Sequence, residues 1–315
     1  MKMKKKSRIV LVMLIAMVFF MGCAAQAKDA QKSEATTIVT DAKGEVEIPT
    51  DPKRIVDLSG NSDSLSILGY KVTGTANSDA YDYTKFPSYL EDVLEGAEIL
   101  GYSMQDTVDV EAVMNLEPDL IILSTVQEKV YEQLKTIAPT VMIQLEALDW
   151  KEDVKTLGTV FHQKDKAEDW LKNYETKAAS IGNTIKKKQG EDTTYLSFLA
   201  SGGQFFVFDG AGFGEVLYED MGLKKPTGMP EQTDISLPVV TYEGLAAIEA
   251  DHIFVIATDE DLEVLQANEI WNNLPAVKAG KVTTLHASPY FNQGYSPIGR
   301  ELLLDEIAVM LDEPD

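Results

Sequence analysis

Apolar and polar positions along the chain predict two series of short buried strands that alternate with helices. The first series has apolar runs at 53–58, 71–75, 119–123 and 140–144, and the second at 194–200, 204–208, 252–257 and 281–286. A hairpin over 38–49 precedes both series, and a helix over 298–311 ends the second. Short apolar strands that alternate with helices are typical of parallel sheets. The pattern therefore predicts an α/β fold with two lobes.

A long helix is predicted between the two series. From Lys164 to Lys188 there is no proline, Gly182 is the only glycine, and apolar residues recur at steps of three and four. This spacing places one apolar stripe on a helix face. About 24 residues with a rise of ~1.5 Å each make a rod of roughly 36 Å. We therefore predict an N-terminal lobe at 38–160, a rigid connecting helix at 161–189 and a C-terminal lobe at 190–315.

The two lobes share a repeated segment. Residues 110–121 read VEAVMNLEPDLI and residues 242–253 read YEGLAAIEADHI, so an offset of 132 aligns Glu111 with Glu243. Each copy starts after a helix-capping residue and ends in a buried strand. The alternative is that two helix-then-strand units resemble each other by chance. We interpret the repeat as a sign of two lobes of similar design.

The N-terminus has the three parts of an export signal. Four lysines and Arg8 precede an apolar run from Ile9 to Met21, which Gly22 and Cys23 follow. This run is shorter than the roughly 20 apolar residues that a membrane-spanning helix needs, and it fits a signal peptide at 1–22. The sequence FMGC at 20–23 resembles a bacterial lipobox, with phenylalanine in place of the usual leucine. Cys23 is then predicted to carry a lipid anchor, with 23–37 as a flexible tether; the alternative is an ordinary signal peptide cleaved nearby.

Cysteine usage and charge exclude several classes of protein. Cys23 is the only cysteine, which rules out an intramolecular disulfide and a thiolate metal cluster. The chain has 28 basic and 51 acidic residues; without the five basic residues of the leader, 23 against 51 leave a net charge of −28. So acidic a surface repels phosphate backbones, and nucleic-acid binding is not expected.

Several segments in a fixed order carry a family resemblance. They are PKRIV at 52–56, NLEPDLII at 115–122, IAPT at 137–140, the helix after Trp150, IWNNLPAV at 270–277 and the tail at 291–307. Together they resemble the periplasmic-binding-protein family that serves iron–siderophore and cobalamin ABC importers. The resemblance implies a class III fold, in which one rigid helix bridges two α/β lobes and the ligand lies in the cleft between them.

The resemblance also implies a partner. In that family each lobe carries a surface glutamate that docks into an arginine-lined pocket of the permease, and the matching positions are Glu111 and Glu243. The partner would be a permease heterodimer or homodimer with its ATPase, served by a monomeric, lipid-anchored binding protein on the extracytoplasmic face of the membrane. The alternative is that each glutamate only stabilises its own helix, through a favourable interaction of its carboxylate with the helix dipole that contributes ~0.3–1 kcal/mol.

Loops at the carboxyl ends of the strands are predicted to line the cleft. Most of their side chains are aromatic, which suits a bulky and partly apolar chelate. The expected ligand-binding residues are Ser59, Asn61, Tyr81, Tyr83, Tyr102 and Met104 from the first lobe and Phe205, Phe206, Phe213, Tyr290, Phe291, Asn292, Tyr295 and Arg300 from the second. Arg300 could bond to the metal-bound oxygens of a chelate, or it could pair with Glu301, Asp305 or Glu306. The segment GAGFG at 210–214 lacks the lysine of a phosphate loop and is interpreted as a flexible lip of the cleft.

The ligand class follows from the side chains on offer. A bare transition-metal ion needs several converging ligands, whereas the chain has only His162, His252 and His286, none expected to converge with another. We therefore expect no cofactor and no direct metal site. Few basic residues remain to hold a strongly anionic chelate, so a ferric siderophore of hydroxamate type, close to neutral or cationic, is favoured.

Other ligands and functions remain as alternatives. Haem could be bound through Tyr102, Met104, Tyr290 or His286, and cobalamin is a further possibility. A surface lipoprotein without a transport role is the other alternative. The chain contains neither a Gly-x-Ser-x-Gly nucleophile motif nor a His-Glu-x-x-His zinc motif, so an enzyme is not expected.

Overall fold

The computed structural model describes residues 35–144, 149–234 and 236–312. The predicted signal peptide, Cys23 and most of the predicted tether lie outside the described residues. Residues 37–315 form one compact unit. None of its described helices combines the length and the apolar character that crossing a membrane requires.

The first lobe is built on a parallel five-stranded sheet. The strand order in this sheet is β5-β4-β3-β6-β7, and each strand is hydrogen-bonded to its neighbours in that order. Every side chain of β3, β6 and β7 is buried, as expected for the central strands of a parallel sheet that is covered on both faces. The strands are β3 (Ile55–Asp57), β4 (Val72–Thr75), β5 (Glu98–Ile99), β6 (Leu120–Ser124) and β7 (Thr140–Ile143).

Short helices connect these strands, and a hairpin packs beside the sheet. The hairpin strands β1 and β2 reach β7 through the amide of Ala42, which donates to the carbonyl of Met142. The helices start at capping side chains where the sequence offers them: Asp109 accepts from the amide of Ala112 at the start of α3. The elements are β1 (Thr36–Asp41), β2 (Gly44–Pro49), α2 (Ser62–Ile67), η1 (Ser88–Leu90), α3 (Val110–Asn115), η2 (Thr125–Val130), α4 (Tyr131–Leu134) and α5 (Trp150–Val160).

The second lobe has a mixed sheet rather than the parallel sheet that the strand pattern predicts. Its order is β10-β9-β8-β11-β12, and only β8, β11 and β12 are parallel. β9 is antiparallel to β8 because two glycines with positive φ, Gly202 and Gly203, form a tight turn between them. The strands are β8 (Tyr195–Ser201), β9 (Gln204–Val207), β10 (Val239–Val240), β11 (His252–Ala257) and β12 (Val282–His286).

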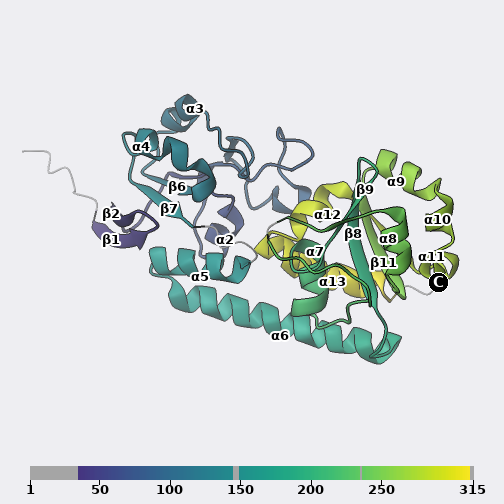
Figure 1. Ribbon diagram of the computed structural model, residues 1–315. Helices are drawn as coiled ribbons and strands as arrows, with labels where there is room; N and C mark the ends of the chain where they lie inside the picture. The colour runs from purple at the N-terminus through teal and green to yellow at the C-terminus, as the bar shows by residue number, and fades with distance from the viewer. Residues whose placement is uncertain (1–34, 145–148, 235, 313–315) are drawn as a thin grey trace, which may run out of the picture. The chain divides into compact units, whose positions relative to one another are not determined.

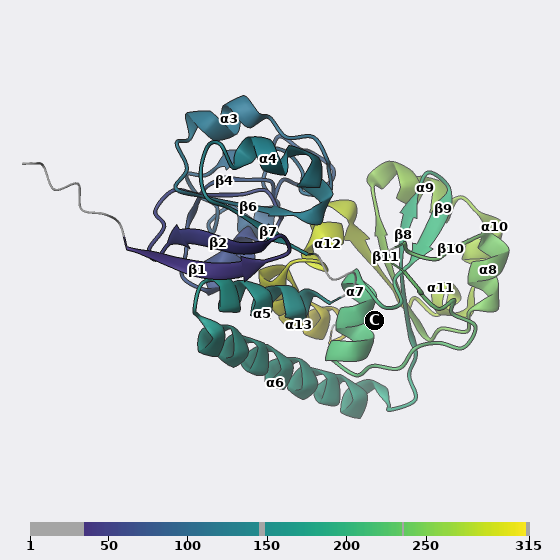
Figure 2. The ribbon, with the colours of Figure 1, turned by 60° about the vertical axis from the view of Figure 1, so that its left-hand side comes forward.

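The helices of the second lobe include two that reach the first lobe. Helices α12 and α13 contact η1, and α13 also contacts α2. Figure 2 shows α12 and α13, in yellow, between the strands of the first lobe and those of the second. The elements are α7 (Gly212–Glu215), η3 (Val216–Asp220), α8 (Tyr242–Ala247), α9 (Asp259–Gln266), α10 (Glu269–Asn272), α11 (Pro275–Lys278), α12 (Ala287–Gln293) and α13 (Pro297–Met310).

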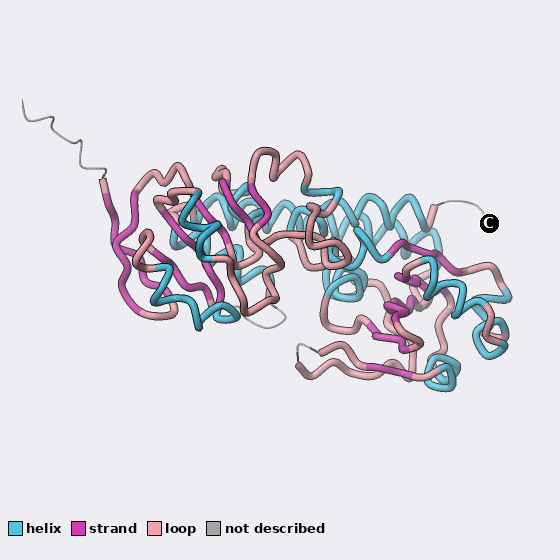
Figure 3. Tube along the Cα trace, turned by 90° about the horizontal axis from the view of Figure 1, so that it is seen from above, coloured by secondary structure: helices cyan, strands magenta, loops and turns pink. Residues whose placement is uncertain are grey.

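A single helix of 26 residues, α6 (Lys164–Gln189), connects the lobes (Figure 1). It packs against α5 of the first lobe and against η3 and α13 of the second. Figure 3 shows the strands in two separate groups with this helix running past both. Two α/β lobes joined by one long helix confirm the predicted fold class.

Helix α6 is held by a core that is continuous across both lobes. Its apolar stripe, including Leu171 and Tyr174, belongs to one buried cluster with Leu65 of α2 and Leu303 of α13. Gly182 allows a close approach, because a Cβ there would lie 1.8 Å from the carbonyl oxygen of Met221. The glycine that weakens the helix therefore also brings it against η3.

Candidate ligand-binding site

Rings from both lobes meet at the carboxyl ends of the strands. Tyr83 stacks on Tyr102 with ring centroids 5.2 Å apart, and the edge of Tyr81 meets Phe291 of α12 at 6.1 Å. Phe291 in turn contacts Tyr295 at 5.5 Å. We call these five residues the aromatic group. All five were predicted from the sequence to line the cleft; the structure places them in two contacting sets, Tyr83 with Tyr102, and Tyr81 with Phe291 and Tyr295.

The aromatic group stands out by its exposure. Tyr81, Tyr83 and Tyr295 are 42%, 47% and 43% exposed. Every other phenylalanine, tyrosine and tryptophan of the described residues is buried or half-buried. The predicted residue Met104 is 49% exposed and lies two positions after Tyr102. Exposed rings that gather in one place are a mark of binding surfaces rather than of ordinary protein surface.

A short loop of the first lobe is bonded to α12. The carboxylate of Asp79 accepts from the amide of Tyr81 at 2.7 Å and from the hydroxyl of Ser288 at 2.5 Å. The side chain of Asn292 accepts from the amide of Ala80 at 3.4 Å. These bonds hold Tyr81 against Phe291. Sequence reasoning identifies Asn292 but misses Asp79 and Ser288, because their contact joins residues more than 200 positions apart.

Ser59 and Asn61 belong to a buried polar cluster at the end of β3. The Asp57 carboxylate accepts from the Ser59 hydroxyl at 2.6 Å and from the Ser62 hydroxyl at 2.6 Å. Burial raises the pKa of Asp57, although these hydrogen bonds oppose the shift. The Asn61 amide donates to Ser59 at 3.3 Å. Ser59 and Asn61 are thus engaged within the first lobe.

Several other predicted residues are placed in the core instead. Phe205 and Phe213 are each 1% exposed and pack against Phe198 and Phe254 respectively. Phe206 is half-buried against the core. The sequence could not separate these phenylalanines from Phe291, because an apolar ring serves a core and a binding surface equally well.

The segment at 290–293 is helical, not a loop as the sequence suggested. It forms the end of α12, so its side chains point to different sides. Phe291 contacts the rings of Tyr81 and Tyr295, and both Phe291 and Tyr290 are partly buried against the core. Burial and the nearby carboxylate of Glu306 raise the pKa of Tyr290.

The glycine-rich segment at 210–214 is closely packed. Gly212 has a φ of +57°, and a Cβ there would lie 3.0 Å from the ring of Tyr295. A Cβ at Gly214 would lie 2.1 Å from the carbonyl oxygen of Phe208. These glycines permit close contacts, which replaces the interpretation of a flexible lip. Burial raises the pKa of Tyr295, and its partial exposure shows that the ring is both surrounded by protein and open to solvent.

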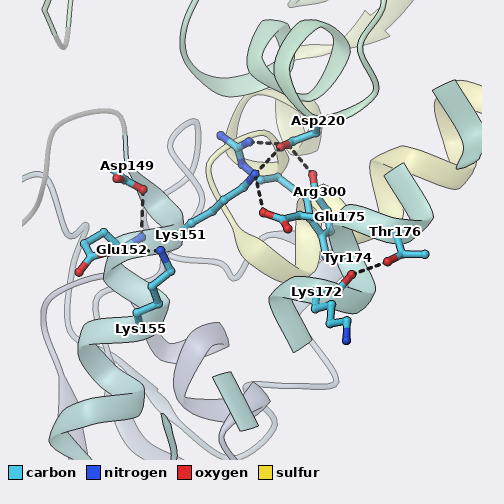
Figure 4. A network of polar contacts seen from close by, with 10 residues as sticks. All are labelled: Asp149, Lys151, Glu152, Lys155, Lys172, Tyr174, Glu175, Thr176, Asp220 and Arg300. Carbon is cyan, nitrogen blue, oxygen red and sulfur yellow. Dashed lines mark hydrogen bonds and ion pairs between the residues drawn. The ribbon is translucent and has the colours of Figure 1, made fainter. Parts of the chain in front are cut away.

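Arg300 is buried in a polar network where α5, α6, η3 and α13 meet (Figure 4). It is 1% exposed, and its guanidinium forms ion pairs with Glu215 and, at 3.1 Å, with Asp220. The guanidinium also lies 4.7 Å from the ring centroid of Trp150. Burial would lower the pKa of Arg300, but the two carboxylates outweigh this effect and raise it.

The predicted partners of Arg300 are therefore corrected. Glu301, Asp305 and Glu306 share its helix, but successive residues turn by 100° and leave these side chains on other sides. Asp305 instead pairs with Lys177 at 2.8 Å. The network also includes Tyr174 and Lys151, which approach Asp220 at 2.7 Å and 3.1 Å. Nothing in the local sequence identifies these partners.

The two glutamates of the repeat occupy equivalent places. Glu111 and Glu243 are both exposed, in the first turns of α3 and α8. Each helix leads into a strand, β6 or β11, that pairs with the first strand of its sheet series. The matched aspartates act alike: Asp119 accepts from the amide of Arg54 at 2.9 Å, and Asp251 from the amide of Thr194 at 2.9 Å.

The three histidines lie apart in the structure. The ring of His162 bonds to Thr37, that of His252 bonds to Thr283, and that of His286 lies 3.5 Å from Asp259. Across the described residues, no three His, Cys, Asp or Glu side chains are grouped closely enough to hold a metal ion.

Two α/β lobes, one connecting helix and rings contributed by both lobes define the class of two-lobed solute-binding proteins. The model of the family described as "Periplasmic binding protein" matches residues 67–289. The chain belongs to this family, and the membership predicted from its sequence is confirmed.

Individual relatives share nearly the whole chain. "Probable siderophore-binding lipoprotein YfiY" of Bacillus subtilis is 27% identical over 88% of this chain and 90% of its own length. "Iron(3+)-hydroxamate-binding protein FhuD" of the same organism is 32% identical over 81% of this chain and 80% of its own length. The crystal structure of Staphylococcus aureus SirA with staphyloferrin B has a TM-score of 0.70 and 26% identity, covering 88% of this chain and 99% of that one.

Proposed function

We propose that this chain is the substrate-binding lipoprotein of an ABC importer and that it binds a ferric siderophore of hydroxamate type at the aromatic group. The family membership and the names of two relatives, one a siderophore-binding lipoprotein and the other an iron(3+)-hydroxamate-binding protein, support this function. The observation that carries it is the gathering of the exposed aromatic side chains of the described residues at one place. Binding and release require no chemical step, so the chain acts without catalysis.

A ferric chelate suits this surface. Its organic ligand supplies the donor atoms for the iron, so the protein needs only to bind the outside of the complex. Ring faces bury the apolar parts of a bulky chelate, and the hydroxyls of Tyr81 and Tyr83 can bond to its outward oxygens. The buried Arg300 contributes to the fold around the site rather than to the contact surface.

Fluorescence titration of the mature protein tests the ligand. Ferric hydroxamate, ferric catecholate, haem and cobalamin would be added separately, and the quenching of tyrosine and tryptophan emission followed. We expect the ferric hydroxamate to bind most tightly. Tyr81→Ala and Tyr83→Ala should weaken binding by about tenfold or more each, in line with anchor residues of interfaces. The control is Val309→Ala, which removes an exposed apolar side chain of α13. Tight binding of haem alone, or equal effects of all three variants, would refute the assignment.

Docking to the permease is the second part of the proposal. Glu111 and Glu243 are exposed on equivalent helices, one in each lobe, and two carboxylates on a rigid body form a two-point contact for a basic socket. Replacing both with alanine should abolish uptake of the ferric chelate by whole cells while its affinity for the purified protein stays unchanged. Glu132→Ala on the exposed surface of α4 is the matched control. Loss of chelate affinity in the double variant would contradict the docking role.

The anchor completes the arrangement. A diacylated Cys23 would hold the protein on the extracytoplasmic face of the cell membrane, beside its permease and ATPase partners. The relative named as a lipoprotein supports this location.

A further inference from the structure

Two carboxylates, Asp79 and Asp261, act on Tyr81 of the aromatic group. Asp79 is 3% exposed and holds the loop that carries Tyr81. Asp261 lies in the first turn of α9 in the second lobe, and its carboxylate accepts from the amide of Gly202 and the hydroxyl of Thr258, both at 2.8 Å. Burial, then the charges of Asp261 and Asp79, raise the pKa of Tyr81 to about 12. The rings of the site therefore lie in a negative field.

The cations near the site are already neutralised. Arg300 pairs with both Glu215 and Asp220. Lys85 pairs with Asp82 at 2.8 Å, and Lys129 pairs with Asp106. Within the described part of the chain, no lysine or arginine forms an ion pair with Asp79 or Asp261, whose bonds are to hydroxyls and amides. In the described part of the chain, the hydrogen bonds of these two carboxylates are thus to neutral groups.

We infer that this site selects a ferric chelate that carries a positive charge, such as a protonated primary amine next to the iron-binding hydroxamates, over a neutral chelate of the same shape. This inference rests on the proposed function and specifies its substrate class. Two attractions add up: a cation is attracted by the π face of a tyrosine, and it is attracted by each carboxylate. An anionic chelate meets the opposite field and loses affinity.

The test compares two probes that differ in one charge. The iron complex of the linear trihydroxamate desferrioxamine B carries a free amine, and its N-acetyl derivative has the same iron core without that charge. The affinities of the mature protein for both are measured, with ferric citrate as an anionic third probe. We expect the amine-bearing complex to bind about tenfold more tightly than the acetylated one, a difference of ~1.4 kcal/mol.

The ratio of the two affinities is the decisive quantity, because damage to the fold would change both affinities together. Asp261→Asn should reduce the ratio by about threefold, and raising the salt concentration should reduce it in the wild type, as expected for charge attraction. Glu260→Gln removes the same charge from an exposed neighbouring position and should leave the ratio within about twofold, because screening weakens distant exposed charges.

The outcomes separate the inference from the proposed function. Equal affinities for the amine-bearing and acetylated complexes would overturn the inference and leave the hydroxamate assignment intact. A ratio that Asp261→Asn and Glu260→Gln change equally would also overturn it. Tighter binding of ferric citrate than of both hydroxamates, or no binding of any hydroxamate, would instead overturn the proposed function.

Discussion

Replacing Arg300 with methionine should strongly destabilise the protein without a comparable loss of chelate affinity. Methionine keeps the apolar stem of the side chain and removes the guanidinium, which is 1% exposed. The change leaves Glu215 without its cationic partner and removes one of two cations from Asp220, because Lys151 remains 3.1 Å away.

The magnitude follows from the cost of a buried unpaired charge. Removing one partner of a buried ion pair costs ~3–5 kcal/mol, and Lys151 keeps the cost for Asp220 at the lower end. The lost contact between the guanidinium and the Trp150 ring adds to it, by ~1 kcal/mol. We expect the free energy of unfolding to fall by about 3–5 kcal/mol, a large part of the stability of an ordinary domain.

Urea denaturation followed by circular dichroism measures this loss. The matched control is Arg54→Met, since Arg54 is the other arginine of the described residues and is exposed; it should cost less than about 1 kcal/mol. A triple variant that combines Arg300→Met with Glu215→Gln and Asp220→Asn should recover most of the stability, because no buried carboxylate is then left unpaired.

Two results would refute this reasoning. An Arg300→Met protein within about 1 kcal/mol of the wild type would mean that the buried network contributes little. A variant that keeps its stability but binds the ferric chelate about a hundredfold less tightly would make Arg300 a ligand-contacting residue, as a hot spot of binding would behave.

Three further predictions concern pH, packing and the anchor. Burial raises the pKa of Asp63 to about 6, above its unfolded value, so its favourable contribution is complete below about pH 4 and is lost as the pH rises through 6. Between pH 4 and pH 7 the wild type should therefore lose ~2–3 kcal/mol of unfolding free energy that the Asp63→Asn variant does not lose. Urea denaturation at several pH values measures this difference; parallel plots of unfolding free energy against pH for the two proteins would contradict it. Gly182→Ala should destabilise the protein by ~1–3 kcal/mol in urea denaturation, because its Cβ would meet the Met221 backbone at 1.8 Å. The control is Ala179→Gly on the exposed side of α6, which should cost ~1 kcal/mol through helix propensity alone. If Gly182→Ala stabilised the protein instead, the contact between α6 and η3 would be loose. Cys23→Ser should move the protein from the membrane fraction into the medium, as immunoblotting would show; retention in the membrane would contradict the lipid anchor.

Local patterns in the sequence determined the elements and their order. The spacing of apolar residues predicted α6 and nearly all the strands, because helix and strand periods depend on neighbouring residues only. The repeat at 110–121 and 242–253 predicted two lobes of similar design, and the matched roles of Asp119 and Asp251 give its physical basis. The five rings of the aromatic group could be named because they follow the carboxyl ends of strands.

Tertiary structure decided what each side chain does. Phe205 and Phe213 are buried in the core, whereas Phe291 belongs to the aromatic group, although the three side chains are chemically identical. Arg300 pairs with carboxylates of η3 and α7, which lie more than 75 positions away in the sequence, rather than with those of its own helix. The carboxylate of Asp79 in the first lobe accepts a hydrogen bond from Ser288 in the second, and this bond holds the loop that carries Tyr81 beside α12. Burial and charge pairing depend on which surfaces the folded chain brings together, and a local pattern of residues carries no information about that.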